Sequence, residues 1–141
     1  MIIPDANLLI YAYDERSPFH AKARTWLEGL LNGEEAVGLC PVVIFAFVRI
    51  ATNARAFVDP MTIGEASGHV RSWLDEEVTR VLDMDAASCI EALQLLDRAG
   101  AGANLTTDAQ IAAIATANKA TIHSADADFA RFGVDWKNPL D

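Results

Sequence analysis

Short apolar segments alternate with helical patterns along this chain, and this alternation limits the folds that it can adopt. Strands are predicted at residues 1–4, 37–40, 78–82 and 121–123, with a fifth at 134–136. Helices are predicted between and after them, at residues 7–12, 18–31, 42–51, 62–74, 86–99, 107–118 and 126–132. Strands that alternate with helices predict an α/β fold, a three-layer α/β/α sandwich whose central sheet is mostly parallel and flanked by helices.

Several helix ends carry their own signals. Thr62 and Glu65 have the spacing of a capping box, and Thr107 with Gln110 has the same spacing at the head of an alanine-rich segment. Gly100 follows the helix predicted at residues 86–99 and is expected to end it.

Length and composition favour one domain over residues 1–141, with 52% hydrophobic and 22% charged residues, which makes disorder improbable. Cys40 and Cys89 lie in apolar contexts without metal-site spacing, so we expect both to be buried, reduced thiols. No basic leader precedes the first strand, and the longest apolar run, residues 41–48, is too short to span a bilayer. We therefore expect a cytoplasmic protein without membrane contact.

The net charge of −9 argues against a protein that grips nucleic acid through a broad basic face. It does not exclude an enzyme that binds its substrate through a metal ion and a few local cations.

Four aspartates, Asp5, Asp108, Asp126 and Asp128, stand where apolar segments end or a helix begins. In an open α/β sheet, ligands bind at this border between loop and core. Carboxylates gathered there would repel one another unless a divalent cation neutralised them. The pattern predicts a metal-dependent hydrolase of phosphate esters.

Each aspartate also has a structural explanation. Asp5 and Asp126 could each cap the helix that follows, and Asp108 and Asp128 could be first-turn acids favoured by the helix dipole. For Asp128 alone, the structural explanation is the better one. His20, His69 and His123 are expected to be structural rather than catalytic.

Four segments, residues 2–12, 47–57, 102–109 and 123–129, together form a specific set of motifs. In these segments the chain resembles PIN-domain ribonucleases, and more closely the VapC toxins of bacterial toxin–antitoxin pairs, especially a mycobacterial-type subgroup. The resemblance covers essentially the whole chain.

The resemblance implies a Mg²⁺-dependent site, with Mn²⁺ as an alternative, that cleaves RNA. Asp5 and Asp108 would be metal ligands, and Asp126 would complete the catalytic set. Asp128, Asn7, Asn104 and Thr106 would lie around the site, and Arg49 and Arg55 would contact the RNA backbone.

One position departs from the family pattern. Many PIN domains have a glutamate three residues before the arginine of the third helix, and here that position is Ala46. The site loses a negative charge, which Asp128 could replace if its side chain turned inward.

The resemblance also implies two protein partners. A VapB antitoxin would wrap the protein and place a basic side chain in the acidic site, which suits the net charge. A homodimer would form through helix surface around Phe45 and Phe47, unless these are core residues.

Two other functions compete with the ribonuclease. A catalytically weakened PIN domain could act as an RNA- or antitoxin-binding module, which Ala46 and the acidic charge favour. A phosphotransfer domain of the receiver or haloacid-dehalogenase kind also clusters aspartates, but Asp5 is not followed by a second aspartate at Asn7 and no lysine is suitably placed.

Overall fold

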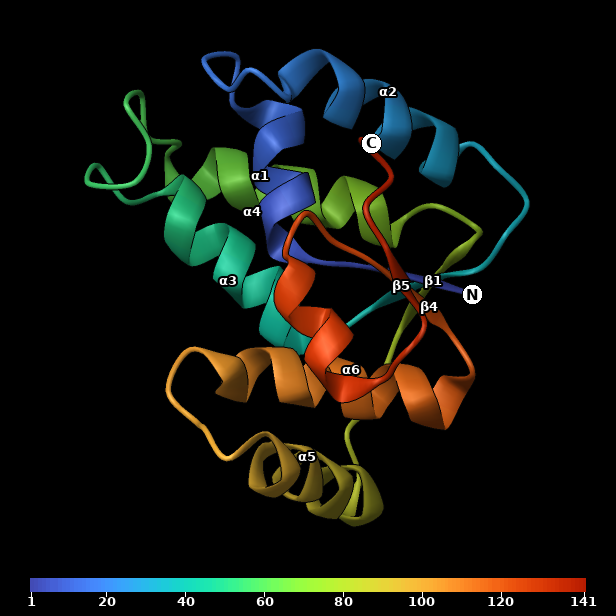
Figure 1. Ribbon diagram of the computed structural model, residues 1–141. Helices are drawn as coiled ribbons and strands as arrows, with labels where there is room; N and C mark the ends of the chain where they lie inside the picture. Colours follow the sequence, from blue (N-terminus) through green and yellow to red (C-terminus); the bar gives the residue numbers. More distant parts are fainter.

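In a computed structural model that describes all 141 residues, five strands form one sheet in the order β3-β2-β1-β4-β5 (Figure 1). All neighbouring pairs are parallel, so the predicted α/β fold is confirmed. The strands are β1 (Ile2–Pro4), β2 (Val37–Leu39), β3 (Thr79–Val81), β4 (Thr121–His123) and β5 (Trp136–Lys137).

The helices agree with the sequence pattern to within a few residues at most ends. They are α1 (Ala6–Tyr13), α2 (His20–Leu31), α3 (Pro41–Ala51), α4 (Ile63–Leu74), α5 (Ala86–Ala99), α6 (Leu105–Asn118) and the 3₁₀ helix η1 (Ala127–Phe132). Thr62 and Glu65 form the predicted capping box at 3.1 Å in each direction, and Gly100 ends α5 with a φ of 68°.

The capping box predicted at Thr107 is wrong. Helix α6 already begins at Leu105, and no side chain caps it. The backbone N–H of Leu105 donates to the Gly102 carbonyl at 3.0 Å, so a turn leads directly into the helix. Asp108 nevertheless remains in the first turn.

The order of the strands reverses once along the chain. From β1 the chain passes through α1 and α2 to β2, and through α3 and α4 to β3; α5 and α6 then lead back to β4 on the far side of β1. Right-handed crossovers place helices of the outward and return paths on opposite faces. Figure 1 shows α1, α2 and α4 on one side of the sheet and α5 and α6 on the other. The carboxyl ends of β1 and β4 therefore flank the crevice where an α/β sheet binds ligands.

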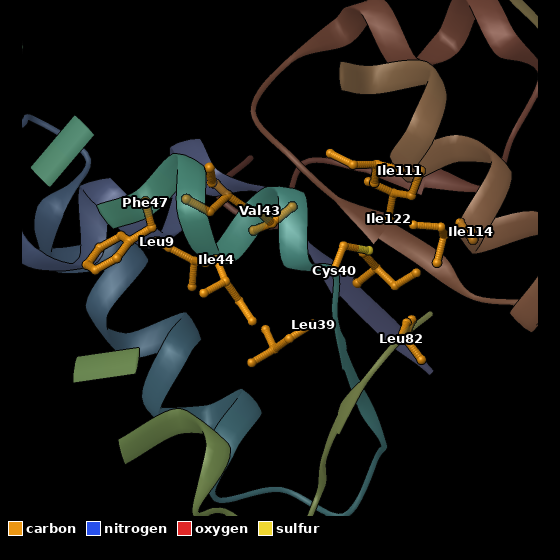
Figure 2. Packing of buried hydrophobic residues seen from close by; sticks show 14 of the residues in the cluster. Leu9, Leu39, Cys40, Val43, Ile44, Phe47, Leu82, Ile111, Ile114 and Ile122 are labelled. Atoms are coloured by element: carbon orange, nitrogen blue, oxygen red, sulfur yellow. The ribbon is translucent and has the colours of Figure 1, made fainter. Parts of the chain in front are cut away.

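The core fills both sides of the sheet. Figure 2 shows Leu9, Ile44 and Phe47 of α1 and α3 packing together, and Ile111 and Ile114 of α6 lie on the other side. All five side chains are buried. None of the helices combines the length and the apolar character needed to cross a membrane.

Two expectations about burial need correction. Cys40 is buried, but Cys89 is exposed on α5, because it lies on the side of that helix that does not face the core. On α3, Phe47 is fully buried while Phe45 is 69% exposed. Residues two positions apart on a helix point in different directions, so Phe47 is a core residue and only Phe45 is free to join an interface.

The two phenylalanines of α3 provide a matched test of this packing. Phe47→Ala is expected to lower the free energy of unfolding by about 3–5 kcal/mol, because it leaves a cavity in the core. Phe45→Ala is expected to change it by no more than about 0.5 kcal/mol. Urea unfolding followed by circular dichroism measures both values. Equal losses of unfolding free energy in the two variants would show that α3 does not turn Phe47 into the core and Phe45 to the solvent.

Candidate metal and catalytic site

Asp5 connects the end of β1 to the start of α1. Its carboxylate Oδ1 accepts a hydrogen bond from the Ala6 N–H at 2.8 Å, so it caps α1, and its own N–H donates to the His123 carbonyl at 2.9 Å. The side chain is only 8% exposed. Asp5 is therefore both a helix cap and a buried carboxylate at the crevice, and the two interpretations of the sequence do not exclude each other.

Ser124 follows β4 and joins the two sides of the crevice. Its buried hydroxyl donates to Asp5 Oδ2 at 2.7 Å and accepts from Asn7 Nδ2 at 3.2 Å and from the Asp126 N–H at 2.9 Å. Sequence reasoning did not select this serine, although its place directly after a strand is the same signal that selected Asp5 and Asp126. Asn7 also accepts from the Ala125 N–H at 3.4 Å.

Three carboxylates meet in front of Asp5. Asp108, Asp126 and Asp128 each offer an oxygen atom within 4.8 Å of the others. Asp126 caps η1 by accepting the Asp128 N–H at 2.9 Å, and this tight turn brings Asp128 beside the other two. Asp128 itself is exposed, so its carboxylate joins the other two from the solvent side and adds its negative charge there.

Asp5 lies outside this group of three but interacts with it. Its negative charge, with those of Asp126 and Asp128, adds to burial in raising the pKa of Asp108 to about 7. Burial also raises the pKa of Asp5 itself, against the opposing effect of its hydrogen bonds to Ser124 and Ala6.

The site has no cation of its own. No lysine or arginine forms a salt bridge with any of the four aspartates. Hard oxygen donors at this spacing, together with a carboxyl whose pKa is raised by its neighbours, are the donor set that suits a divalent cation such as Mg²⁺. The residues present therefore fit a metal ion.

Four other predicted site residues form no hydrogen bond or salt bridge with the carboxylates of the aspartates. Asn104 and Thr106 are exposed at the start of α6, and Thr106 lines a groove with residues of α5. Arg49 and Arg55 are exposed, and neither forms a salt bridge or donates a side-chain hydrogen bond within the chain. Ala46 is half-buried against the core and offers no charge.

Two further titratable side chains, His123 and Cys40, are held in their neutral forms. The Trp26 indole N–H donates to His123 Nδ1 at 3.1 Å, and burial lowers the pKa of His123 to about 4. Burial and the nearby Asp5 carboxylate raise the pKa of the Cys40 thiol to about 12. Neither side chain is suited to act as a base at neutral pH, which agrees with a structural role for His123.

Comparison with known proteins connects this geometry to a family. Residues 2–135 match the PIN domain model. The chain belongs to the PIN-domain family. This PIN domain is 42% identical over 141 residues to ribonuclease VapC33 of Mycobacterium tuberculosis, covering 99% of both chains. It is 38% identical over 140 residues to ribonuclease VapC37 of the same species, covering 99% of this chain and 97% of that one.

Solved structures agree with the fold. The M. tuberculosis toxin VapC20, which cleaves the sarcin-ricin loop, matches with a TM-score of 0.72 at 18% identity, over 95% of this chain and 96% of that one. VapBC2 of Rickettsia felis, bound to a promoter DNA fragment, matches with a TM-score of 0.69 at 17% identity, over 98% of both chains. The family expectation from the sequence is confirmed.

Asp108 makes the stability of this PIN domain depend on pH. Because its pKa rises from 3.8 to about 7 on folding, the folded state binds its proton more tightly, and this group lowers stability as pH rises between those values. Without divalent ions, Asp108→Asn is expected to raise the melting temperature relative to the parent, little near pH 4 and most above pH 7. Scanning calorimetry over this range measures the difference, with the exposed Asp97→Asn as control. A difference that does not change with pH would contradict the raised pKa.

Proposed function

We propose that this PIN domain, as one domain over residues 1–141, is a metal-dependent endoribonuclease toxin of a type II toxin–antitoxin system that acts in the cytoplasm. The observation that carries the proposal is the group of three carboxylates, Asp108, Asp126 and Asp128, at the sheet's switch point beside buried Asp5. The sequence identity of 42% between this chain and ribonuclease VapC33 also supports it.

Mg²⁺, or Mn²⁺ in its place, is the proposed cofactor. Asp108, Asp126 and Asp128 would hold it. Asp5 could join them directly or through water, because its two oxygens accept only one hydrogen bond each and retain lone pairs. When bound, the cation supplies charge neutralisation for the scissile phosphate and acidifies the attacking water.

The chain's own residues orient the reaction. Ser124 fixes Asp5 and the backbone of Asp126 together, so the two carboxylates keep their relative positions. Asp126 uses Oδ1 to cap η1, and its Oδ2 makes no hydrogen bond, so this oxygen can position the attacking water. Water rather than the 2′-OH is the nucleophile in this mechanism, so no 2′,3′-cyclic phosphate forms. If the P–O3′ bond breaks and the 3′-oxygen leaves as a hydroxyl, the product carries a 5′-phosphate.

Arg49 and Arg55 are proposed to contact the RNA backbone. Both are exposed and neither is in a salt bridge, so their charges are available to phosphate groups. In a chain of net charge −9, such local cations would have to offset a general repulsion of RNA.

Cleavage of total cellular RNA by the purified protein tests the enzyme. With Mg²⁺ or Mn²⁺ we expect limited cuts with 5′-phosphate ends, and with EDTA none. Asp5→Asn and Asp108→Asn are each expected to lower the cleavage rate by at least about 100-fold. Ser124→Ala is expected to lower it by about 10- to 100-fold, because it acts by positioning the carboxylates.

Two controls sharpen this assay. Asp97→Asn on exposed α5 and Ser88→Ala, a buried serine of α5, should keep the parent rate. Cleavage that survives both site substitutions would point to a contaminating nuclease or to another site.

A catalytically weakened binding module is the second candidate function. Ala46 favours it, because the acid common at this position in the family is missing and the helix offers only a half-buried methyl group there. RNA or antitoxin binding that is retained in Asp5→Asn, in a parent protein that never cleaves RNA, would support this module against the enzyme.

A VapB-type antitoxin and a homodimer are the proposed protein partners. An acidic site attracts a basic antitoxin side chain, and Phe45, 69% exposed on α3, is an apolar contact available to a second copy. Sedimentation velocity is expected to show a dimer that Phe45→Asp weakens. Adding the cognate antitoxin should form a larger complex and stop RNA cleavage. A parent that stays monomeric, or continued cleavage in the complex, would contradict the respective partner.

A further inference from the structure

A pocket of about 460 Å³ lies beside the carboxylate site, between α1, the start of α2 and the C-terminal segment. Figure 1 shows this segment running up beside α2. The volume lies in the range typical of small-ligand sites. Its lining consists of Tyr11, Phe19, Lys22, Ala125, Asn138, Leu140 and Asp141.

The pocket adjoins the carboxylate site through one residue of its wall. Ala125 in its wall lies between Ser124 and Asp126, and the Ala125 N–H donates to Asn7 Oδ1 at 3.4 Å. Asn7 and Tyr11 are four residues apart on α1, so they lie on the same face of that helix, one turn from each other. A nucleotide next to a phosphodiester held at the carboxylates would therefore reach this pocket.

Two aromatic rings form one side of the pocket. The ring centroids of Tyr11 and Phe19 are 5.1 Å apart at an interplanar angle of 41°. Phe19 is 46% exposed, and the Tyr11 hydroxyl makes no hydrogen bond within the chain. Aromatic faces of this kind stack on unpaired RNA bases, and a free hydroxyl can bond to a base edge.

The side chains of the lining include one cation and one anion. Lys22 is its one cation, forms no salt bridge, and donates to the Leu140 carbonyl at 3.4 Å. Asp141 is its one acidic side chain. Lys22 also lines an adjoining hollow of about 600 Å³ together with Trp26, which lies one helical turn further along α2. Stacking rather than charge would therefore dominate binding here, with Lys22 placed between two aromatic side chains.

We propose that this pocket binds an unpaired RNA base next to the cleaved phosphodiester, stacked on Phe19 and Tyr11, with Lys22 contacting a neighbouring phosphate. The inference rests on the proposed ribonuclease function and deepens it. The base has to be unpaired, because a paired base could not leave its stack to enter the pocket.

Binding of abasic RNA tests this proposal separately from cleavage. The assay uses the Asp108→Asn protein, whose cleavage is expected to be at least about 100-fold slower. Its ligands are short fluorescent single-stranded oligoribonucleotides in which one position at a time is abasic. Fluorescence anisotropy is expected to show one abasic position, next to the site cut by the parent, that weakens binding at least about fivefold.

Substitutions of Phe19 then connect this loss to the pocket. Phe19→Leu, which keeps an apolar side chain but removes the ring, should weaken binding of unmodified RNA by the same factor and should make the abasic position harmless. The Phe19→Tyr protein, which keeps an aromatic ring, should bind unmodified RNA as tightly as the protein with Phe19. Leu74→Ala, a similarly exposed apolar position on α4, should change nothing. Thermal unfolding checks that each variant is folded.

The possible results separate the two proposals. A flat abasic scan, or unchanged RNA affinity in Phe19→Leu, overturns the base pocket even where the parent cleaves RNA in an Asp108-dependent manner. A localised abasic effect that Phe19→Leu removes, in a protein whose parent never cleaves RNA, supports base binding in the pocket but overturns the enzyme and the place of the base next to a cleaved bond. If Phe19→Leu weakens binding of the antitoxin but not of RNA, the pocket is a protein-binding site and the proposal is wrong.

Discussion

The parallel pairing of β1 with β4 is the constraint on which the site depends. Ile3 faces Ile122 in this pairing and Pro4 faces His123, so the residues that follow the two strands emerge side by side. Asp5 and Ser124, 119 positions apart in sequence, can then share a 2.7 Å hydrogen bond. A shift of one residue would turn each side chain to the opposite face of the sheet and separate them. The register of two three-residue strands thus determines the geometry of the site.

The same geometry concentrates an electrostatic cost on one residue. Asp5 is more deeply buried than Asp108, but it accepts hydrogen bonds from Ser124 and Ala6 that partly offset its desolvation. The Asp108 side chain accepts none, and it faces three other carboxylates. Within the protein, nothing offsets the repulsion between Asp108 and these carboxylates, and a bound cation would reduce it. The residue that lowers the stability of the fold most at high pH is therefore the one that gains most from metal.

Features fixed by local chemistry could be predicted from the sequence. Asp5, directly after β1, and Asp126, three residues after β4, stand out because polar residues that follow apolar strands lie at the sheet edge. Gly100 ends α5 because it adopts a left-handed conformation. Features that depend on which side of a helix faces the sheet could not be predicted as well. The exposure of Cys89 and the closeness of Asp128 to Asp108 and Asp126 depend on tertiary packing, and the sequence spacing alone does not contain them.

Charge and pocket chemistry together suggest how a strongly acidic protein could select RNA. A net charge of −9 slows the approach of a polyanion and speeds that of a basic protein. RNA would then have to be held by short-range contacts, namely the cation, a few arginines and a stacked base, all of which act only after the strand has entered the crevice. A basic antitoxin would instead be attracted by the negative electrostatic field of the protein before any contact forms. Under the proposed function, the acidic surface would therefore favour inhibition over substrate capture whenever both partners are present, and the toxin would act only once the antitoxin has been removed.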